Sequence, residues 1–221
     1  MMNKYRLLIV LAVLAALVLA LPAIVGCGDG DTASAPQETT KEDAQQEPVS
    51  PGTDKVLVVV ADSDVNETEC NAVLQVLSGG GYDLVVANAS GEDAAGDRGD
   101  VYPVDIAIAE VDPGDYKAVV LVGGVGMTEY FEDPTVHVLV QEMDAAGKTV
   151  AAICIAPVIL ANAGILEGVE ATVSSSRRDA LAVAGAVVVD EPVVVDGKII
   201  TGWGPDAADD FAQAVKDALA D

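Results

Sequence analysis

The chain has 221 residues, of which 51% are hydrophobic, and it carries 36 acidic against 11 basic side chains, for a formal net charge of -25. This length and apolar content allow one domain of ordinary size with additional segments. So large a negative charge argues against nucleic acid and anionic lipid surfaces as partners, because both would repel it.

The first 26 residues have the pattern of an export signal. Lys4 and Arg6 precede an uncharged apolar run over 7–25, and the run ends in Ile24-Val25-Gly26-Cys27, which resembles the lipobox of lipoprotein signal peptides. We expect cleavage before Cys27 and lipid attachment to its thiol, although a run of this length could also remain as an uncleaved membrane anchor. Either outcome places the rest of the chain outside the cytoplasm, anchored to the cell membrane.

Residues 27–53 form a polar segment rich in Gly, Asp, Thr, Gln, Glu and Pro. It contains too few large apolar side chains to offset the entropy lost on ordering, so we predict a flexible tether. The folded domain is then expected over 54–221.

The 54–221 region alternates apolar runs with amphipathic segments, which predicts an α/β domain. We expect a doubly wound, flavodoxin-like, mostly parallel sheet with helices on both faces. The expected strands are 55–61, 82–87, 117–122 and 150–153, with short ones near 104–111 and 171–173 and a Val-rich hairpin across 186–200, and the expected helices are 67–77, 134–146, 157–163, 176–183 and 206–219.

The stretch Thr149–Pro157 combines a buried strand with a helix start. The uncharged apolar run 150–153 stops at Cys154, and Pro157 fits the first turn of a helix. A strand that turns into a helix at a cysteine is typical of a nucleophile elbow, where the helix dipole and nearby backbone N–H groups favour a thiolate. A buried structural cysteine at a strand end is the alternative interpretation.

Two candidate ligand motifs are incomplete. The glycine turn at 123–126 has neither the lysine of a P-loop nor the spacing of a dinucleotide-binding loop. Asp62, Asp64 and Asn66 have the alternate spacing that opens a calcium loop, but Glu67 occupies the position that requires glycine. We therefore expect neither a cofactor nor a metal ion.

Four blocks of the sequence, 115–126, 146–157, 161–168 and 193–205, resemble the PfpI and DJ-1 family of the class I glutamine-amidotransferase-like superfamily. The resemblance covers essentially all of the region from 54 to 221. It implies an elbow cysteine at Cys154 and an oxyanion pocket from the backbone of Gly124 and Ile155. It also implies a glutamate on the first helix that touches the thiol, at Glu69 or, less favoured, Glu67. Family members commonly self-associate, so the resemblance implies a homo-oligomer.

The sequence departs from this family where an imidazole is expected. PfpI-type hydrolases carry histidine directly after the cysteine, where this chain has Ile155 followed by Ala156. The DJ-1 branch supplies histidine from the region that matches 172–175, which has none. The only histidine, His137, lies on the helix before the elbow and is interpreted as a surface residue. An efficient peptidase or glyoxalase is therefore disfavoured, because general acid–base help is worth roughly 10²–10⁴-fold.

Two functions remain open. In the first, Cys154 is a catalytic or redox-responsive thiol that reacts with a small electrophile such as a reactive carbonyl, with Glu69 tuning it. In the second, the domain is catalytically silent and serves binding or assembly. A Cys70–Cys154 disulfide is a minority hypothesis, since Cys70 follows Glu69 directly and a helix turns adjacent side chains away from one another.

Overall fold

The computed structural model describes residues 54–220. The signal peptide predicted for 1–26 and the tether predicted for 27–53 lie outside the described residues, and both stay predictions. Within the described part of the chain, no helix combines the length and apolar character needed to cross a membrane.

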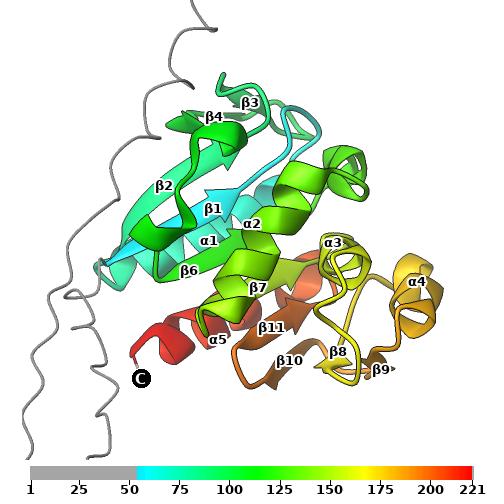
Figure 1. The fold of residues 1–221 in the computed structure, drawn as a ribbon. Coiled ribbons are helices and arrows are strands. Elements are labelled where there is room, and N and C mark those ends of the chain that lie inside the picture. The colour runs from blue at the N-terminus through cyan, green and yellow to red at the C-terminus, as the bar shows by residue number, and fades with distance from the viewer. Residues whose placement is uncertain (1–53, 221) are drawn as a thin grey trace, which may run out of the picture. The chain divides into compact units, whose positions relative to one another are not determined.

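Seven strands form one sheet in the order β10-β11-β7-β6-β1-β2-β5 (Figure 1). Neighbouring strands are parallel except for the antiparallel pair of β10 and β11. Every residue of β6 and β7 is buried, because helices cover both faces of the sheet centre, and this explains why these strands are continuous apolar runs. The strands are β1 (Lys55–Val59), β2 (Asp83–Asn88), β5 (Ile106–Ala107), β6 (Ala118–Leu121), β7 (Thr149–Ile153), β10 (Val193–Asp196) and β11 (Ile199–Gly202).

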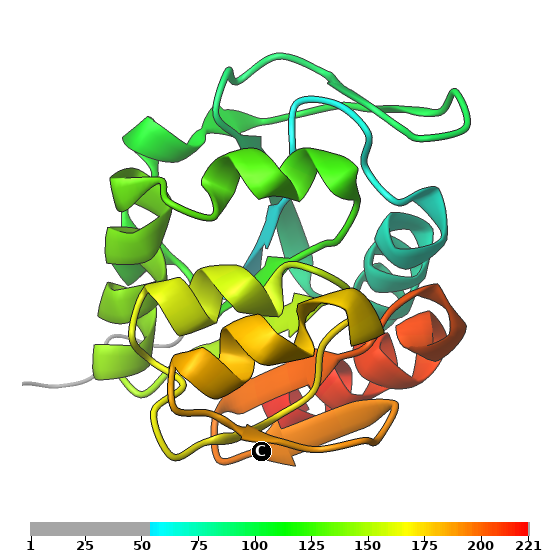
Figure 2. The same ribbon diagram turned by 90° about the vertical axis from the view of Figure 1, so that its right-hand side faces the viewer.

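Helices lie on both faces of this sheet. In Figure 1, α2 (Pro134–Ala145) and α3 (Pro157–Asn162) lie in front of it, whereas α1 (Glu67–Gly79) and α5 (Ala208–Ala220) lie behind. Figure 2 shows α1 and α5 side by side, and α4 (Arg178–Val183) packs on α3. The core divides accordingly into two apolar clusters, one on each face. The predicted doubly wound fold is confirmed.

Some short elements differ from the sequence expectation. Residues 94–102, where no strand was expected, contain β3 (Ala94–Ala95), which pairs antiparallel with β4 (Val101–Tyr102). The expected hairpin across 186–200 is wrong in its first half, because β9 (Val187–Val188) pairs in parallel with β8 (Glu170–Ala171). The hairpin that does form joins β10 to β11, and it turns through Gly197 at a φ of 59°.

Short 3₁₀ helices complete the connections. The segment expected as an edge strand over 104–111 is β5 followed directly by the first of these helices. Another 3₁₀ helix follows the glycine turn after β6, and a third precedes α5. They are η1 (Ile108–Glu110), η2 (Pro113–Asp115), η3 (Val125–Tyr130), η4 (Ser175–Arg177) and η5 (Pro205–Ala207).

Candidate active site

Cys154 lies in a sharp turn between β7 and α3. Its φ is 65°, in the left-handed region that residues other than glycine and asparagine rarely adopt. Hydrogen bonds on both sides hold this backbone: the Cys154 N–H donates to the Gly202 carbonyl at 2.9 Å, and the Ser174 N–H donates to the Cys154 carbonyl at 2.8 Å. Strain of this kind persists only where the surroundings fix it, and it is the backbone geometry of a nucleophile elbow.

The start of α1 is attached to the glycine turn after β6. The Asn66 N–H donates to the Gly123 carbonyl at 3.1 Å, and the Asn66 side chain caps the helix by accepting from the Glu69 N–H at 3.1 Å. These two bonds fix the rotation of the first helical turn. As a result Glu69 is fully buried and its side chain faces the end of β6.

Gly123 is the point at which Glu69 and Cys154 meet. A Cβ built on Gly123 would overlap both the Glu69 Oε2 atom and the Cys154 Cβ atom, and would lie 3.0 Å from the Ile153 carbonyl oxygen. The carboxyl group and the cysteine side chain therefore pack against the same bare Cα. Only glycine permits this arrangement, whereas the family resemblance pointed to the backbone of the neighbouring Gly124.

The two acidic groups at this point both favour their neutral forms. Burial raises the pKa of Glu69 from 4.5 to about 7, although the Cys154 thiol and the Gly123 N–H act against this. Burial also raises the pKa of the Cys154 thiol from 9.0 to about 12, and the neighbouring charge of Glu69 adds to the rise. The N–H groups of Gly124 and Ile155 favour the thiolate and partly offset it. These are the two backbone donors that the family resemblance implied.

Neither carboxyl oxygen of Glu69 accepts a hydrogen bond of standard geometry from any described residue. The thiol and the Gly123 N–H approach the carboxyl and lower its pKa, but they do not satisfy it. A buried carboxyl without firm donors is stable mainly as the protonated acid. Glu69 is thus able to hold or release one proton beside the sulfur near neutral pH.

Glu67, the less favoured candidate, has a different partner. Its carboxylate accepts from the Arg98 N–H at 2.7 Å and the Asp100 N–H at 2.9 Å, and it pairs with the Arg98 Nε at 3.1 Å. The hydrogen bond from Asp100, with those from Arg98, lowers the pKa of Glu67. Glu67 therefore fixes the loop between β3 and β4 and does not face the thiol.

The remaining candidates lie away from this pair or are inert. Cys70 is fully buried on α1, and both Cys70 and Cys154 are free thiols, so the minority hypothesis of a disulfide between them is wrong. Burial raises the pKa of Cys70 to about 12. His137 lies partly buried on α2 with its Nε2 2.8 Å from the Phe131 carbonyl oxygen. Within residues 54–220 no group of three or more His, Cys, Asp and Glu side chains could hold a metal ion.

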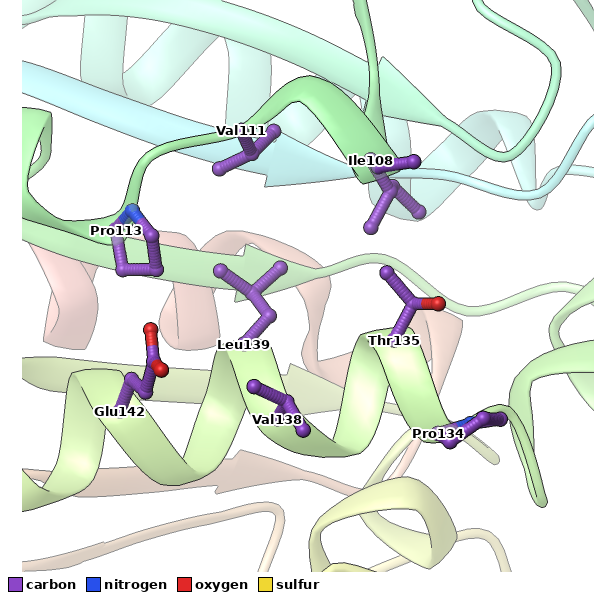
Figure 3. Close-up of a pocket in the computed structure, with 9 residues that line it drawn as sticks. Ile108, Val111, Pro113, Pro134, Thr135, Val138, Leu139 and Glu142 are labelled. Carbon is purple, nitrogen blue, oxygen red and sulfur yellow. The ribbon is translucent and has the colours of Figure 1, made fainter. Parts of the chain in front are cut away.

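Two surface cavities differ in their relation to Cys154. One of about 350 Å³ lies between η1 and α2; Figure 3 shows Leu139 and Thr135 of α2 pointing toward the segment that carries Ile108 and Val111. Glu142 is the only titratable residue in its lining, so it offers little chemistry. The other, of about 290 Å³, lies between the segment that follows β8 and the segment that follows β11, and its lining includes Ser174, whose N–H donates to the Cys154 carbonyl.

Comparison with known proteins agrees with this geometry. Residues 54–218 match the sequence profile described as the DJ-1/PfpI family. The chain belongs to the DJ-1/PfpI family.

Relatives in this family include characterised and uncharacterised proteins. The chain is 39% identical to the protein MJ0967 of Methanocaldococcus jannaschii over 75% of this chain and 82% of that protein. It is 34% identical to a protein named deglycase TK1284 of Thermococcus kodakarensis over 68% of this chain and 90% of that one. A ThiJ/PfpI domain protein of Brachyspira murdochii, of known crystal structure, is 31% identical, with a TM-score of 0.75 over 76% of this chain and 98% of that one.

We predict that Glu69→Gln flattens the dependence of stability on pH. The pKa of Glu69 lies near 7 in the folded state against 4.5 ordinarily, so its favourable contribution is complete below pH 4.5 and is lost as pH rises through 7. The loss is roughly 3 kcal/mol. Urea unfolding of both proteins at pH 4.5 and 8 measures it. Glu67→Gln is the control and should instead lower stability at neutral pH; equal pH slopes in wild type and Glu69→Gln would contradict the assignment.

We also predict that Gly123→Ala disrupts the site. The new methyl group would overlap the Glu69 carboxyl and the Cys154 Cβ, so one of them must move. Overpacking of this kind costs about 1–3 kcal/mol, seen as a lowered Tm, and should change the alkylation rate of Cys154. Gly79→Ala is the matched control, because nothing lies within 4 Å of its added Cβ. If both variants behave as wild type, Gly123 does not hold the pair together.

Proposed function

We propose that this protein carries out thiol chemistry on small reactive carbonyl compounds, with Cys154 as the nucleophile and Glu69 as its proton carrier. The observation behind the proposal is the buried Glu69 carboxyl, whose pKa of about 7 lies next to the thiol. A general acid or base works best when its pKa is close to the operating pH. Glu69 therefore supplies the function that an imidazole has elsewhere in the family.

The reaction begins with addition of the sulfur to the carbonyl carbon. The ionised Glu69 takes the thiol proton as the sulfur–carbon bond forms, and the carbonyl π electrons move to oxygen. The N–H groups of Gly124 and Ile155, which already favour a negative charge on sulfur, lie beside the developing oxyanion. Glu69 then returns the proton to that oxygen, which gives a neutral hemithioacetal without any oxidant or reductant.

The family comparison supports this class of chemistry. One relative at 34% identity is named a deglycase. This chain differs from such relatives, because Ile155 replaces the histidine typical of PfpI-type hydrolases, and its one histidine, His137 on α2, has its Nε2 atom 2.8 Å from the Phe131 carbonyl oxygen. Proton transfer at Cys154 then depends on Glu69 alone among the residues near the elbow.

Because Glu69 and Cys154 share one proton, we predict a specific dependence on pH for the alkylation of Cys154 by iodoacetamide. The reactive form is a thiolate beside a protonated Glu69, which has the same proton count as a thiol beside an ionised Glu69. The rate should therefore rise about tenfold per pH unit up to a midpoint near 7 and then level off. A free cysteine would instead keep rising to about pH 8.5.

Glu69→Gln should remove the step near pH 7, and Glu67→Gln should keep it. Mass spectrometry of the alkylated peptide at pH 5–10 gives these rates. An unchanged midpoint in Glu69→Gln, or a wild-type rate that rises without any step near pH 7, would show that the pair does not act as proposed.

We further propose that the domain acts at a membrane surface outside the cytoplasm. The support is the pattern of residues 1–27, which resembles a lipoprotein signal ending at Cys27. A tether of some 25 polar residues would separate the domain from the bilayer and allow it to reach soluble small molecules.

Cys27→Ala should then move the protein out of the membrane fraction or leave its signal uncleaved. Membrane fractionation together with the mass of the amino-terminal peptide measures this, and Cys154→Ala is the control that should remain membrane-bound. Wild-type protein with an unmodified Cys27 in the soluble fraction would contradict the proposal.

A catalytically silent domain is the second candidate function. Ile155 at the position of the family histidine favours it, since the chain lacks the imidazole that would assist hydrolysis. The two candidates differ in one result: Cys154→Ala abolishes carbonyl turnover if the site is catalytic, and changes nothing measurable if the domain serves only binding.

A further inference from the structure

The cavity of about 290 Å³ next to the elbow has polar walls that the chemistry at Cys154 does not explain. One wall comes from the segment after β8 and carries Ser174, Ser175 and Arg178. The other follows β11 and carries Trp203 and Asp206. Its size suits a small organic molecule.

Both walls are attached to the backbone of Cys154. The Ser174 N–H donates to the Cys154 carbonyl, and the Cys154 N–H donates to the carbonyl of Gly202, one residue before Trp203. The cavity therefore begins beside the elbow, and a molecule bound in it is held at a fixed position relative to the partly exposed Cys154.

Arg178 has unused hydrogen-bonding capacity in this cavity. Its Nη2 atom pairs with the carboxylate of Asp190, which is 73% exposed. Its Nε–H is buried and has no hydrogen-bond partner among residues 54–220. The Arg178 side chain is 37% exposed, so other N–H groups of its guanidinium are accessible from the cavity that it lines, and an oxygen of a carboxylate or phosphate is the acceptor that such a group binds with the best geometry.

The charge of the whole chain makes this arginine unusual. With 36 acidic and 11 basic side chains, the protein repels small anions in general. Arg177 and Arg178 are adjacent at this one place, and Arg177 lies over the Phe131 ring at 5.4 Å from its centre. Two adjacent cations in so acidic a chain were the sequence signal for this site. Asp206, on the opposite wall, keeps an anion on the Arg178 side.

We propose that Arg178 determines specificity by binding an anionic oxygen group, a carboxylate or a phosphate, on the carbonyl compound that reacts with Cys154. This inference rests on the proposed function and adds the substrate class to it. The guanidinium and the serine hydroxyls hold the anionic end in the cavity, and the carbonyl end reaches the sulfur. Addition proceeds as above, with one sulfur–carbon bond formed and one proton passed through Glu69.

The experiment compares two alkylating agents of similar size, one that carries a carboxylate and one that carries a neutral amide. Iodoacetate and iodoacetamide both lose iodide when the Cys154 sulfur attacks their CH₂ carbon, and only iodoacetate presents a carboxylate. The rate with iodoacetate divided by the rate with iodoacetamide, measured by mass spectrometry, should be higher for Cys154 than for a cysteine peptide, although the net charge of the protein is negative. Arg178→Gln should lower the ratio about tenfold, the effect of one charge-assisted hydrogen bond.

Two variants test whether Arg178 acts through direct contact. Lys198→Gln removes one positive charge from the turn between β10 and β11, where the Lys198 carbonyl accepts from the Val150 N–H at the start of β7. This variant should leave the ratio unchanged. Asp190→Asn frees the guanidinium from its partner and should raise the ratio. A merely structural arginine would not produce this opposite pair of shifts.

The outcomes separate the two proposals. If Cys154 reacts with neither reagent, the proposed thiol function is wrong. If Cys154 reacts with both reagents, its ratio of rates equals that of the peptide, and Arg178→Gln does not change this ratio, then the thiol function stands and the anion site is overturned. Acetate and inorganic phosphate, added at equal ionic strength, should slow alkylation by iodoacetate; the stronger competitor identifies the oxygen group, and protection by neither overturns the site.

Discussion

The contact of two side chains with the bare Cα of Gly123 is the constraint on which this site depends. The carboxyl of Glu69 and the Cβ of Cys154 occupy the space that any other residue at 123 would need. Three elements converge there: the first turn of α1, the end of β6 and the end of β7. Their positions follow from the parallel order of the sheet, which brings the carboxyl ends of neighbouring strands to one edge. The site is thus a consequence of topology completed by one glycine.

This contact also determines the charge of the site. Burial disfavours ionisation of both Glu69 and Cys154, and at this separation each charge opposes the other. The pair therefore carries at most one negative charge over the physiological range, and that charge is shared as a single proton moves between oxygen and sulfur. A carboxyl in this position can replace an imidazole in proton transfer, although it offers no positive charge to hold the thiolate.

Much of this structure could be predicted from the sequence, and the successes have a common cause. The strands β1, β6 and β7 are covered on both faces, so their sequences are continuous apolar runs, apart from Lys55 and Thr149 at the first positions of β1 and β7. The elbow was predicted from Cys154 and Pro157 because a strand end and a helix start leave strong local signals. Strands of two residues leave none, and for this reason β3 was missed and β9 was assigned to the wrong partner.

The site residues were predicted less completely, for geometric reasons. Glu67 and Glu69 are two positions apart, so they lie on different faces of α1, and only the resemblance favoured Glu69. The structure supplies the cause, because the bonds of Asn66 to Gly123 and to the Glu69 N–H fix the rotation of the helix. The role of Gly123 depends on a close approach of three segments. No pattern within any one of them encodes that approach.

The cation beside the elbow and the proton within it are linked by electrostatics. An anionic group bound near Cys154 would by itself favour the protonated forms of Glu69 and the thiol, and so reduce the reactive thiolate. A guanidinium bound to that group offsets this, because a neutralised anion exerts little net field on the pair. Arg178 would then have two effects from one position: it would attract the substrate and keep the proton of Glu69 available near neutral pH. In a chain with 36 acidic residues, a local cation of this kind is what allows an acidic substrate and a carboxyl proton carrier to share one site.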